Sequence, residues 1–394
     1  MPPRDEDHTG ARIKEQRRLA RLTQRQLAAR LPYSYSYLNQ VECGARPATA
    51  AFVAACARAL SIDVTILTGQ PYVSELQRDR LAELVRPIRE SLDLYDLGPD
   101  PDLTARPAHQ LIAAVDRLCA EVRATHLRSA ARDLPGLITE LTHTAWSTPA
   151  TTLWQALASA YRTAHDISVK LGYYDLSAVA LDRMAWAADR ASDPRLSAVR
   201  QYMRALVYFR EGEYRIGQRL IAVGQDLLGQ DDPSREALAV AGQLHLGASV
   251  IAARAGEQSA VEQHIAEAGR IAQRVGEAPD VYWLSFGPTN VALHQVSAAV
   301  ETCQYDEALK QARNIHLPPR LPTSRRAHFL IDRARAEMET GHTDAALKSL
   351  VDARRLAPEQ TRYHPAARDT ITGLVHQSRR TPETLHRMAT WVGL

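Results

Sequence analysis

A short polar segment near the N-terminus carries side chains suited to hydrogen bonding with nucleic-acid bases. Its exposed face is expected to hold hydroxyl and carboxamide groups and no bulky acid, namely Ser34, Tyr35, Ser36, Asn39 and Gln40. These groups match the donors and acceptors that base edges present in the major groove. We therefore expect the segment to read DNA, provided that it folds as a helix with these side chains outward.

Basic residues are concentrated around this polar segment. Residues 1–70 contain ten Lys and Arg against six Asp and Glu, whereas the rest of the chain contains 38 against 39. Such a local excess is typical of a phosphate-binding module, although a solvated surface with a chance bias is the alternative. Gln24 is expected to grip a phosphate from the start of a helix. Five arginines lie where the DNA backbone would pass: Arg12, Arg17, Arg21, Arg25 and Arg46.

Capping residues and apolar spacing predict the helices that position these side chains. Thr23 is a suitable N-cap for a helix at 24–31, and Ser34 for a helix that continues to residue 42 and ends at Gly44. Leu38 and Val41 are spaced to face inward from the second of these helices. Further helices are expected at 10–20, at 49–60 and around 63–68, with a tight turn at residues 32–33.

Three motifs resemble the helix-turn-helix family of the lambda and 434 repressors (the XRE family). They are Leu22-Thr23-Gln24-x-x-Leu27-Ala28, Ser34-x-x-Tyr37-Leu38-x-x-Val41-Glu42 and Gly44-x-Arg46-Pro47. The resemblance implies base or backbone contacts from Gln24, Ser34, Tyr35, Ser36 and Gln40, and a phosphate contact from Arg17. Glu42 is interpreted as a structural residue buried near Arg17 or a backbone amide. The sequence departs from the family at Pro32, where Gly is usual and Pro cannot supply a left-handed φ, and at Tyr35, where Arg or Gln is common.

The sequence from about residue 150 contains a weak helical repeat. Apolar residues recur every three to four positions, and each first helix ends at a small residue. The turns are Gly172-Tyr173-Tyr174, Gly212-Glu213-Tyr214, Gly256-Glu257-Gln258, Cys303-Gln304-Tyr305 and Gly341-His342-Thr343. Five positions after each turn begins stand Ser177, Gly217, Val261, Ala308 and Ala346, where small residues let two helices approach closely. The pattern resembles the tetratricopeptide repeat with longer, uneven spacing; an irregular helical bundle is the alternative.

Polar residues at fixed distances before these turns predict a binding groove. Gln243, Asn290 and His328 stand thirteen positions before successive turns, and His294 and Asp332 stand nine before. By the tetratricopeptide resemblance, the first register faces the concave side. Arg162, Tyr202, Ser297 and Arg335 are expected at other inward registers. Carboxamides along a groove suit an extended peptide, because each can donate and accept a hydrogen bond; a helix–helix hydrogen bond is the alternative at each position.

This layout is similar to that of Gram-positive quorum-sensing regulators, which bind short peptides through such repeats. It is also similar to an actinobacterial group with the same type of N-terminal domain and a repeat-like C-terminal region. The segment Phe286-Gly-Pro-Thr-Asn-Val-Ala-Leu-His294 is characteristic of that group. These resemblances imply a sensor region that responds to a signalling peptide or small molecule.

Other functions are disfavoured by motifs that the sequence lacks. It has no P-loop, zinc-protease, nucleophile-elbow or dinucleotide-binding pattern, so we expect neither an enzyme nor a bound cofactor or metal. No run of 18 apolar residues predicts a membrane span, and the charged N-terminus is unlike a signal peptide, so we expect a cytoplasmic protein. Cys43, Cys56, Cys119 and Cys303 are expected to be reduced structural thiols.

The sequence thus predicts an all-α protein with a five-helix, lambda-repressor-like domain followed by a tetratricopeptide-like α-solenoid. The expected domains are 9–70 for DNA binding, 71–135 as a connecting helix and linker, and 136–394 as a repeat domain for sensing or dimerisation. We expect a transcriptional regulator that binds a double-stranded operator as a homodimer, under the control of a peptide or small molecule. Control by a protein partner docked on the repeat scaffold is the alternative.

Overall fold

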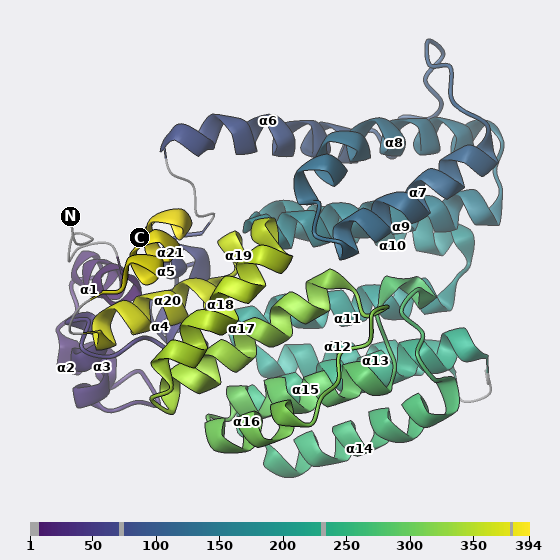
Figure 1. The fold of residues 1–394 in the computed structure, drawn as a ribbon. Helices are drawn as coiled ribbons and strands as arrows, with labels where there is room; N and C mark the ends of the chain where they lie inside the picture. The colour runs from purple at the N-terminus through teal and green to yellow at the C-terminus, as the bar shows by residue number, and fades with distance from the viewer. Residues whose placement is uncertain (1–7, 71–74, 230–233, 379–380) are drawn as a thin grey trace.

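The computed structural model describes residues 8–70, 75–229, 234–378 and 381–394, and all of its regular structure is helical (Figure 1). Within these ranges no strand forms, and a single isolated β-bridge pairs Ala278 with Phe286. The predicted all-α class, with an N-terminal helix-turn-helix domain and a following helical domain, is therefore confirmed.

Five short helices build the N-terminal unit, which we call the head (residues 9–68). They are α1 (Thr9–Leu19), α2 (Gln24–Ala28), α3 (Tyr35–Glu42), α4 (Ala50–Leu60) and α5 (Val64–Thr68). The predicted caps form: Thr23 Oγ1 accepts from Gln26 N while Gln26 Oε1 accepts from Thr23 N, and Ser34 Oγ accepts from Tyr37 N. Because these caps satisfy free backbone donors, they fix where α2 and α3 begin. The apolar core beneath them is fully buried and includes Ile13, Leu27, Leu38, Phe52 and Leu67.

The remaining helices form the helical domain. They are α6 (Glu75–Leu92), α7 (Ala108–Arg123), α8 (Leu127–Ser147), α9 (Thr151–Leu171), α10 (Tyr174–Ala191), α11 (Pro194–Glu211), α12 (Tyr214–Leu228), α13 (Arg235–Ala255), α14 (Gln258–Val275), α15 (Pro288–Glu301), α16 (Tyr305–Arg313), α17 (Thr323–Glu339), α18 (Thr343–Leu356), α19 (Pro358–Tyr363), α20 (Pro365–Gln377) and α21 (Glu383–Val392). Successive helices pack as hairpins: α9 on α10, α11 on α12, α13 on α14, α15 on α16 and α17 on α18.

All five expected turns between paired helices are confirmed. Each has a positive φ at its first residue: 88° at Gly172, 75° at Gly212, 80° at Gly256, 59° at Cys303 and 82° at Gly341. The residues five positions later are buried, or in the case of Gly217 closely packed: a Cβ there would lie 3.2 Å from Ile251 Cδ1. These small or compact residues therefore lie where paired helices come together.

The segment 71–135, expected as a connecting helix and linker, has a different structure where it is described. Residues 71–74 lie outside the described residues, but Ile88 of α6, Leu111 of α7 and Leu134 of α8 are fully buried in the same apolar cluster as α9 to α11. The predicted boundary after residue 135 falls inside α8. Pro87, the loop from Gly98 and Pro107 suggested interruptions; Pro87 lies within the continuous helix α6, whereas Gly98 and Pro107 lie between α6 and α7.

An irregular segment separates α14 from α15. Tyr282, Trp283 and Ser285 all have positive φ, at 43°, 51° and 62°. This backbone brings the buried Phe286 ring against the α13 backbone at Gly242, where an added Cβ would lie 2.0 Å from Phe286 Cζ. Helix α13 is long and apolar enough to cross a membrane by length and composition, but its most apolar window is 78% buried inside the protein. That composition is explained by its central place in the core.

The helical domain closes on itself through contacts between its two ends. Lys170 Nζ of α9 donates to Gln360 Oε1 of α19 at 2.7 Å, and the Arg128 amide donates to Glu359 Oε2 at 2.9 Å. The head packs near this closure: Arg58 Nη1 of α4 donates to the carbonyl of Gly212 at 2.9 Å. Figure 1 shows α4 and α5 on the inner side of the head, and α2 and α3 at the outer edge of the molecule.

Candidate functional site

The outer face of α3 presents the polar side chains that the sequence assigned to DNA contact. The α3-face residues, namely Ser34, Tyr35, Ser36, Asn39 and Gln40, are all exposed. Arg46, just beyond the helix, is also exposed and places its guanidinium 4.4 Å from the centre of the Tyr37 ring. Tyr37 itself packs against Tyr33 and Phe52 in the head core. Hydroxyl, carboxamide and guanidinium donors are thus displayed together on a rigid support.

Arg17, expected to contact a phosphate, instead lies in a buried ion pair. Its Nε and Nη2 donate to the two Glu42 carboxylate oxygens at 2.7 and 2.8 Å, and its Nη1 donates to the Leu22 carbonyl at 2.8 Å. The hydrogen bond to Glu42 raises the pKa of Arg17. The structural role expected for Glu42 therefore includes Arg17 as its partner. The Arg17 side chain is buried, and its Nε, Nη1 and Nη2 atoms all donate hydrogen bonds within the head.

Gln24 is half-buried and connects this ion pair to α3. Its Nε2 donates to Glu42 Oε2 at 2.8 Å and to Asn39 Oδ1 at 3.3 Å, and its Oε1 accepts from the Tyr35 hydroxyl at 3.2 Å. The side chain expected to grip a phosphate is thus engaged with two α3-face residues. A DNA contact from Gln24 remains a prediction, and in this structure the side chain orients Tyr35 and Asn39.

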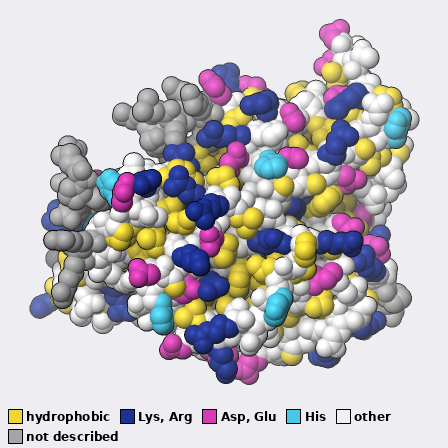
Figure 2. Space-filling model, in the orientation of Figure 1, with side chains coloured by type: hydrophobic (Ala, Val, Ile, Leu, Met, Phe, Trp, Pro, Cys, Tyr) yellow, Lys and Arg dark blue, Asp and Glu magenta, His cyan; other side chains and the backbone are white. Residues whose placement is uncertain are grey.

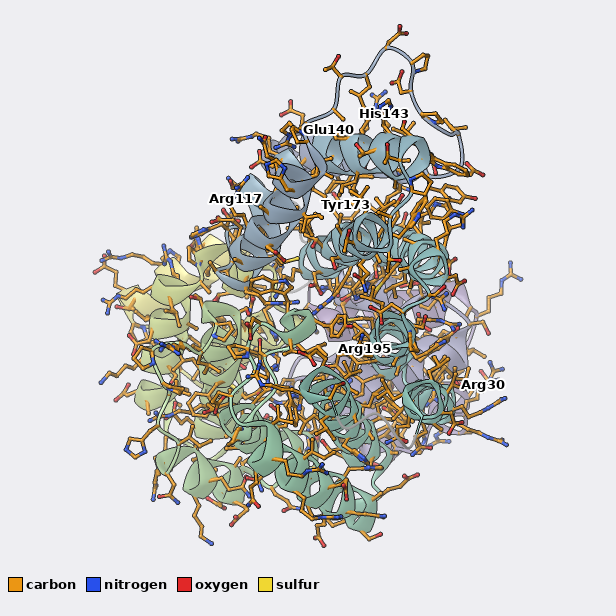
Figure 3. The ribbon with its side chains drawn as sticks, turned by 90° about the vertical axis from the view of Figure 1, so that its right-hand side faces the viewer. Arg30, Arg117, Glu140, His143, Tyr173 and Arg195 are labelled. Atoms are coloured by element: carbon orange, nitrogen blue, oxygen red, sulfur yellow. The ribbon has the colours of Figure 1, made fainter. Side chains whose placement is uncertain are left out.

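The arginines around α3 divide into bound and exposed groups. Arg12 donates from Nε to the Leu67 carbonyl and from Nη2 to the Thr68 carbonyl, which ties α1 to α5. Arg21 and Arg25 are exposed, as are Arg18 and Arg30, which the sequence interpretation did not single out. Figure 3 shows Arg30 labelled at the outer edge of the molecule. These exposed basic residues lie on the loops and helix ends that flank α3, where a DNA backbone would pass.

A cavity lies between the head and the helical domain. We call it the interdomain cavity; its volume is about 390 Å³, within the usual range for small-molecule sites. One wall comes from the head, with Ala50 and Val53 of α4 and Val64 of α5. The other walls come from α9, α11, α13, α15, α17 and α20. Basic and hydrophobic side chains are interspersed across the centre of the face in Figure 2.

Five of the eight side chains expected to bind a ligand line this cavity. They are Tyr202, His294, His328, Asp332 and Arg335. Ser297, expected at an inward register, also lines it and donates from Oγ to Asp332 Oδ2 at 2.5 Å. Ligand binding by these residues remains a prediction, but their common location agrees with the inward registers inferred from the turns.

The other three expected residues are buried outside the cavity lining. Asn290 Nδ2 donates to Gln243 Oε1 at 3.3 Å, and Gln243 Nε2 donates to the Tyr202 hydroxyl at 2.9 Å. Arg162 Nη2 donates to the Trp283 carbonyl at 3.1 Å. The expected stack of Gln243, Asn290 and His328 along one groove is therefore only partly present, because the first two carboxamides bond each other while His328 Nδ1 lies 3.2 Å from His364 Nε2.

Another register, two positions before the first four turns, was missed by the sequence interpretation and supplies four of the eight charged residues that line the cavity. Lys170, Arg210, Arg254 and Glu301 all stand there, and all line the cavity. The residues six before the turns, namely Leu206, Val250, Ser297 and Arg335, line it as well. The cavity therefore lies toward the turn ends of the first helices, where the head packs, rather than around the register thirteen before.

Burial keeps the imidazoles of the cavity neutral. It lowers the pKa of His294 well below its usual value, and it lowers the pKa values of His328 and His364 to about 3. Burial also raises the pKa of Asp332 to about 6. Arg254 offsets the effect of burial on Glu301, whose pKa is lowered, through hydrogen bonds of 2.9 and 2.7 Å. Positive charge in the cavity is thus carried by arginine and lysine, and negative charge by the paired Glu301 and, above pH 6, by Asp332.

The described residues form neither a candidate metal site nor a disulfide bond. No group of three or more His, Cys, Asp or Glu side chains among the described residues could hold a metal ion. Cys43, Cys56, Cys119 and Cys303 are all free, as expected. Burial raises the pKa of the Cys56 thiol to about 12, so this thiol stays protonated within the head core.

Comparison with known proteins identifies the class of the head. Residues 8–65 match the family model described as a helix-turn-helix domain, which covers α1 to α4 and the beginning of α5. The N-terminal unit is therefore a helix-turn-helix domain, in agreement with the α3 geometry.

One curated relative shares sequence with part of the chain. It is described as a propionyl-CoA carboxylase regulator from Cereibacter sphaeroides, and it is 37% identical over 129 residues. That alignment covers 32% of this chain and 26% of the relative, so the chain spans about a quarter of the length of the relative it matches. No solved structure gives a match.

Proposed function

We propose that the protein is a sequence-specific DNA-binding transcriptional regulator whose helical domain binds a signal, a short peptide or small molecule. The observation that carries the proposal is the orientation of the head, which presents α3 outward and contributes α4 and α5 to the interdomain cavity. The helix-turn-helix match and the regulator relative support the DNA-binding part. A cytoplasmic location belongs to the same proposal.

In this proposal the cavity ligand controls the position of the head. A ligand that binds one arrangement of the two units more tightly than another shifts the population toward it. A single head covers few base pairs, so specific binding calls for a homodimer on two half-sites. The ligand then acts by changing the spacing or orientation of the two α3 helices.

The test is fluorescence anisotropy with labelled DNA from the region upstream of the gene. Gln40→Ala removes an exposed carboxamide from the α3 face and is expected to weaken specific binding about tenfold, since a good base contact contributes about 1–3 kcal/mol. Gln273→Ala removes an exposed carboxamide from α14 and serves as the matched control. Equal affinity for all three proteins would overturn the assignment of α3 as the reading helix.

A second candidate is control by a protein partner docked on the helical domain. The observation in its favour is a row of exposed apolar side chains on α12: Ile216, Val223 and Leu227 are 40%, 45% and 38% exposed. Chemical cross-linking from Cys residues introduced along α12 tests this alternative. Recovery of a stoichiometric partner that alters DNA affinity would support it, and recovery of a second copy alone would favour the homodimer.

A further inference from the structure

The interdomain cavity contains three basic side chains without an acidic partner. Lys170, Arg210 and Arg325 line it from α9, α11 and α17. Among the residues that the structure describes, none of the three forms an ion pair with a carboxylate; Lys170 Nζ donates to the neutral Gln360 instead. All three side chains are partly buried, and a basic group withdrawn from water is normally paired, because the loss of solvent disfavours its charge. Three such groups around one cavity therefore indicate a missing anion.

Two of the three acids that line this cavity already have partners, and the third, Asp369, interacts electrostatically with Arg335 and Arg368. Glu301 accepts both hydrogen bonds from Arg254, and Asp332 accepts from Ser297 and lies 3.6 Å from His328 Nε2. In total, five Lys and Arg line the cavity against three Asp and Glu. The excess positive charge consequently has no counterpart in the lining.

Unsatisfied polar atoms point to the same conclusion. Within the described part of the chain, buried atoms without a hydrogen-bond partner include Arg210 Nη1, Arg325 Nε, His294 Nδ1, Tyr363 Oη and His364 Nδ1, all from residues of the cavity lining. His294 is 7% exposed and Tyr363 is 3% exposed. Buried polar groups in proteins almost always have partners, so a cluster of five marks a place where another molecule supplies them.

Electrostatic strain among the three basic groups agrees with an unfilled anion position. Burial lowers the pKa of Lys170 to about 8; Arg123, Arg325 and Arg210 lower it further, and Asp166 opposes them. Burial also lowers the pKa of Arg325. An anion placed among these groups would relieve both the desolvation and the mutual repulsion.

The rest of the lining is apolar and comes from both units. Leu206 and Val250 face the cavity from the helical domain, and Val53 and Val64 face it from the head. Its volume of about 390 Å³ suits a compact organic molecule. An inorganic ion would leave these apolar walls uncovered.

We propose that the interdomain cavity binds a small organic anion, whose carboxylate or phosphate group lies between Lys170, Arg210 and Arg325 while its apolar part contacts the head. This inference rests on the proposed function and gives the chemical class of its signal. The charged group anchors the ligand in the helical domain, and the apolar group reaches α4 and α5. Occupancy of the cavity is then transmitted to the head by direct contact.

The test uses the full chain and two fluorescent probes that differ in charge. Anilinonaphthalene sulfonate carries an apolar body and an anionic group, and N-phenylnaphthylamine has the same ring system without the charge. We expect one molecule of the sulfonate to bind at least tenfold more tightly than the neutral probe. Competition with butyrate in one arm and phenyl phosphate in the other distinguishes a carboxylate from a phosphate ligand.

Variants locate the binding and separate it from a folding defect. Arg325→Met and Lys170→Met are expected to weaken sulfonate binding at least tenfold without weakening the neutral probe, and Arg325→Lys retains most of the affinity. Arg333→Met on α17 and the exposed Lys348→Met are the matched controls, because neither residue lines the cavity. Wild-type Tm is expected to rise with the competing anion, whereas the Arg325→Met Tm stays unchanged by it.

Equal binding of the two probes, or unchanged sulfonate binding in both Met variants, would overturn the anion site. These measurements contain no DNA, so their failure is distinguishable from failure of the proposed function, which the Gln40→Ala anisotropy experiment tests separately. DNA binding without anion binding would leave a regulator whose signal has another chemistry. Anion binding without DNA binding would leave a sensor and overturn the DNA-binding role.

Discussion

The α3 face and the interdomain cavity are opposite solutions to the problem of recognition. The α3 face is exposed and carries neutral hydroxyl and carboxamide groups, which water satisfies until DNA replaces it. The cavity is partly enclosed between the head and the helical domain, and it carries unpaired charges and unsatisfied buried atoms. A surface of the first kind can be rigid and stable without its partner, whereas a cavity of the second kind stays strained until it is filled.

The largest expected effect is a loss of stability in the head, with the helical domain left folded. Glu42→Ala leaves Arg17 buried without an acidic partner, which is expected to cost about 3–5 kcal/mol of head stability and to abolish DNA binding. All five tryptophans lie outside residues 9–68, so their fluorescence reports the helical domain alone. Urea unfolding followed by tryptophan fluorescence should be unchanged, while circular dichroism shows early loss of helix.

The paired control for that variant replaces both charges by apolar groups. Arg17→Met combined with Glu42→Leu removes the buried charge and is expected to recover most of the lost stability. Early unfolding of the double variant to the same extent as Glu42→Ala would show that the instability comes from loss of the ion pair itself and not from the unpaired charge of Arg17.

The next largest effect is a loss of stability in the helical domain, whose helices form most of the cavity, with the α3 face unchanged. Gly242→Ala places a Cβ 2.0 Å from the Phe286 ring, so overpacking is expected to cost about 1–3 kcal/mol in the tryptophan-reported transition. Gly269→Ala is the control, because a Cβ there meets nothing within 4 Å and helix propensity should stabilise by about 0.5–1 kcal/mol. If both variants changed the free energy of unfolding in the same direction, the close packing of Phe286 on α13 would be contradicted.

The smallest expected effect is a pH dependence of folding stability that comes from the buried Asp332 of the cavity, for which the α3 face has no equivalent. Burial raises the pKa of Asp332 to about 6 from an ordinary value of 3.8. The folded protein therefore keeps a proton that the unfolded chain has released, and stability falls as pH rises between these values. The groups around Asp332 that take part are Ser297, Glu301, Arg325, His328 and His364.

Asp332→Asn is expected to remove this loss of stability. Above pH 6 the variant should be more stable than wild type by about 1 kcal/mol, a value reduced for water penetration and relaxation of the protein around the carboxylate. Below pH 4 the two proteins should be equally stable. Thermal unfolding at pH 4 and pH 7.5 measures the difference. A variant that is less stable at pH 7.5 would show that the ionised carboxylate is well stabilised in the cavity.

The elements that local chemistry controls were predictable from the sequence. Ser34 and Thr23 fixed the beginnings of α3 and α2, and the glycines that end α9, α11 and α13 were recognisable as turns. The α3 face followed from period and polarity, because neighbouring residues of one helix determine what it exposes. Such features depend on contacts within a few residues.

The features that long-range packing controls were not predictable in the same way. Arg17 was assigned a phosphate contact and Glu42 a buried position near Arg17 or a backbone amide, because the sequence does not show that the two side chains form one buried ion pair. Residues 71–135 were interpreted as a connecting helix and linker, because Pro87, the loop from Gly98 and Pro107 masked the apolar faces that α6, α7 and the beginning of α8 bury. The cavity register was misplaced toward Gln243 and Asn290, because its position depends on where the head packs against the turn at Gly212.

The closure of the helical domain also constrains the order in which the protein is made. The contacts that complete the ring join residues 190 positions apart, at Lys170 and Gln360, and 231 positions apart, at Arg128 and Glu359. During synthesis the head emerges first and can fold from local contacts, long before the last wall of the cavity exists. A chain truncated after α18 would consequently keep a complete DNA-reading helix with no sensor to govern it.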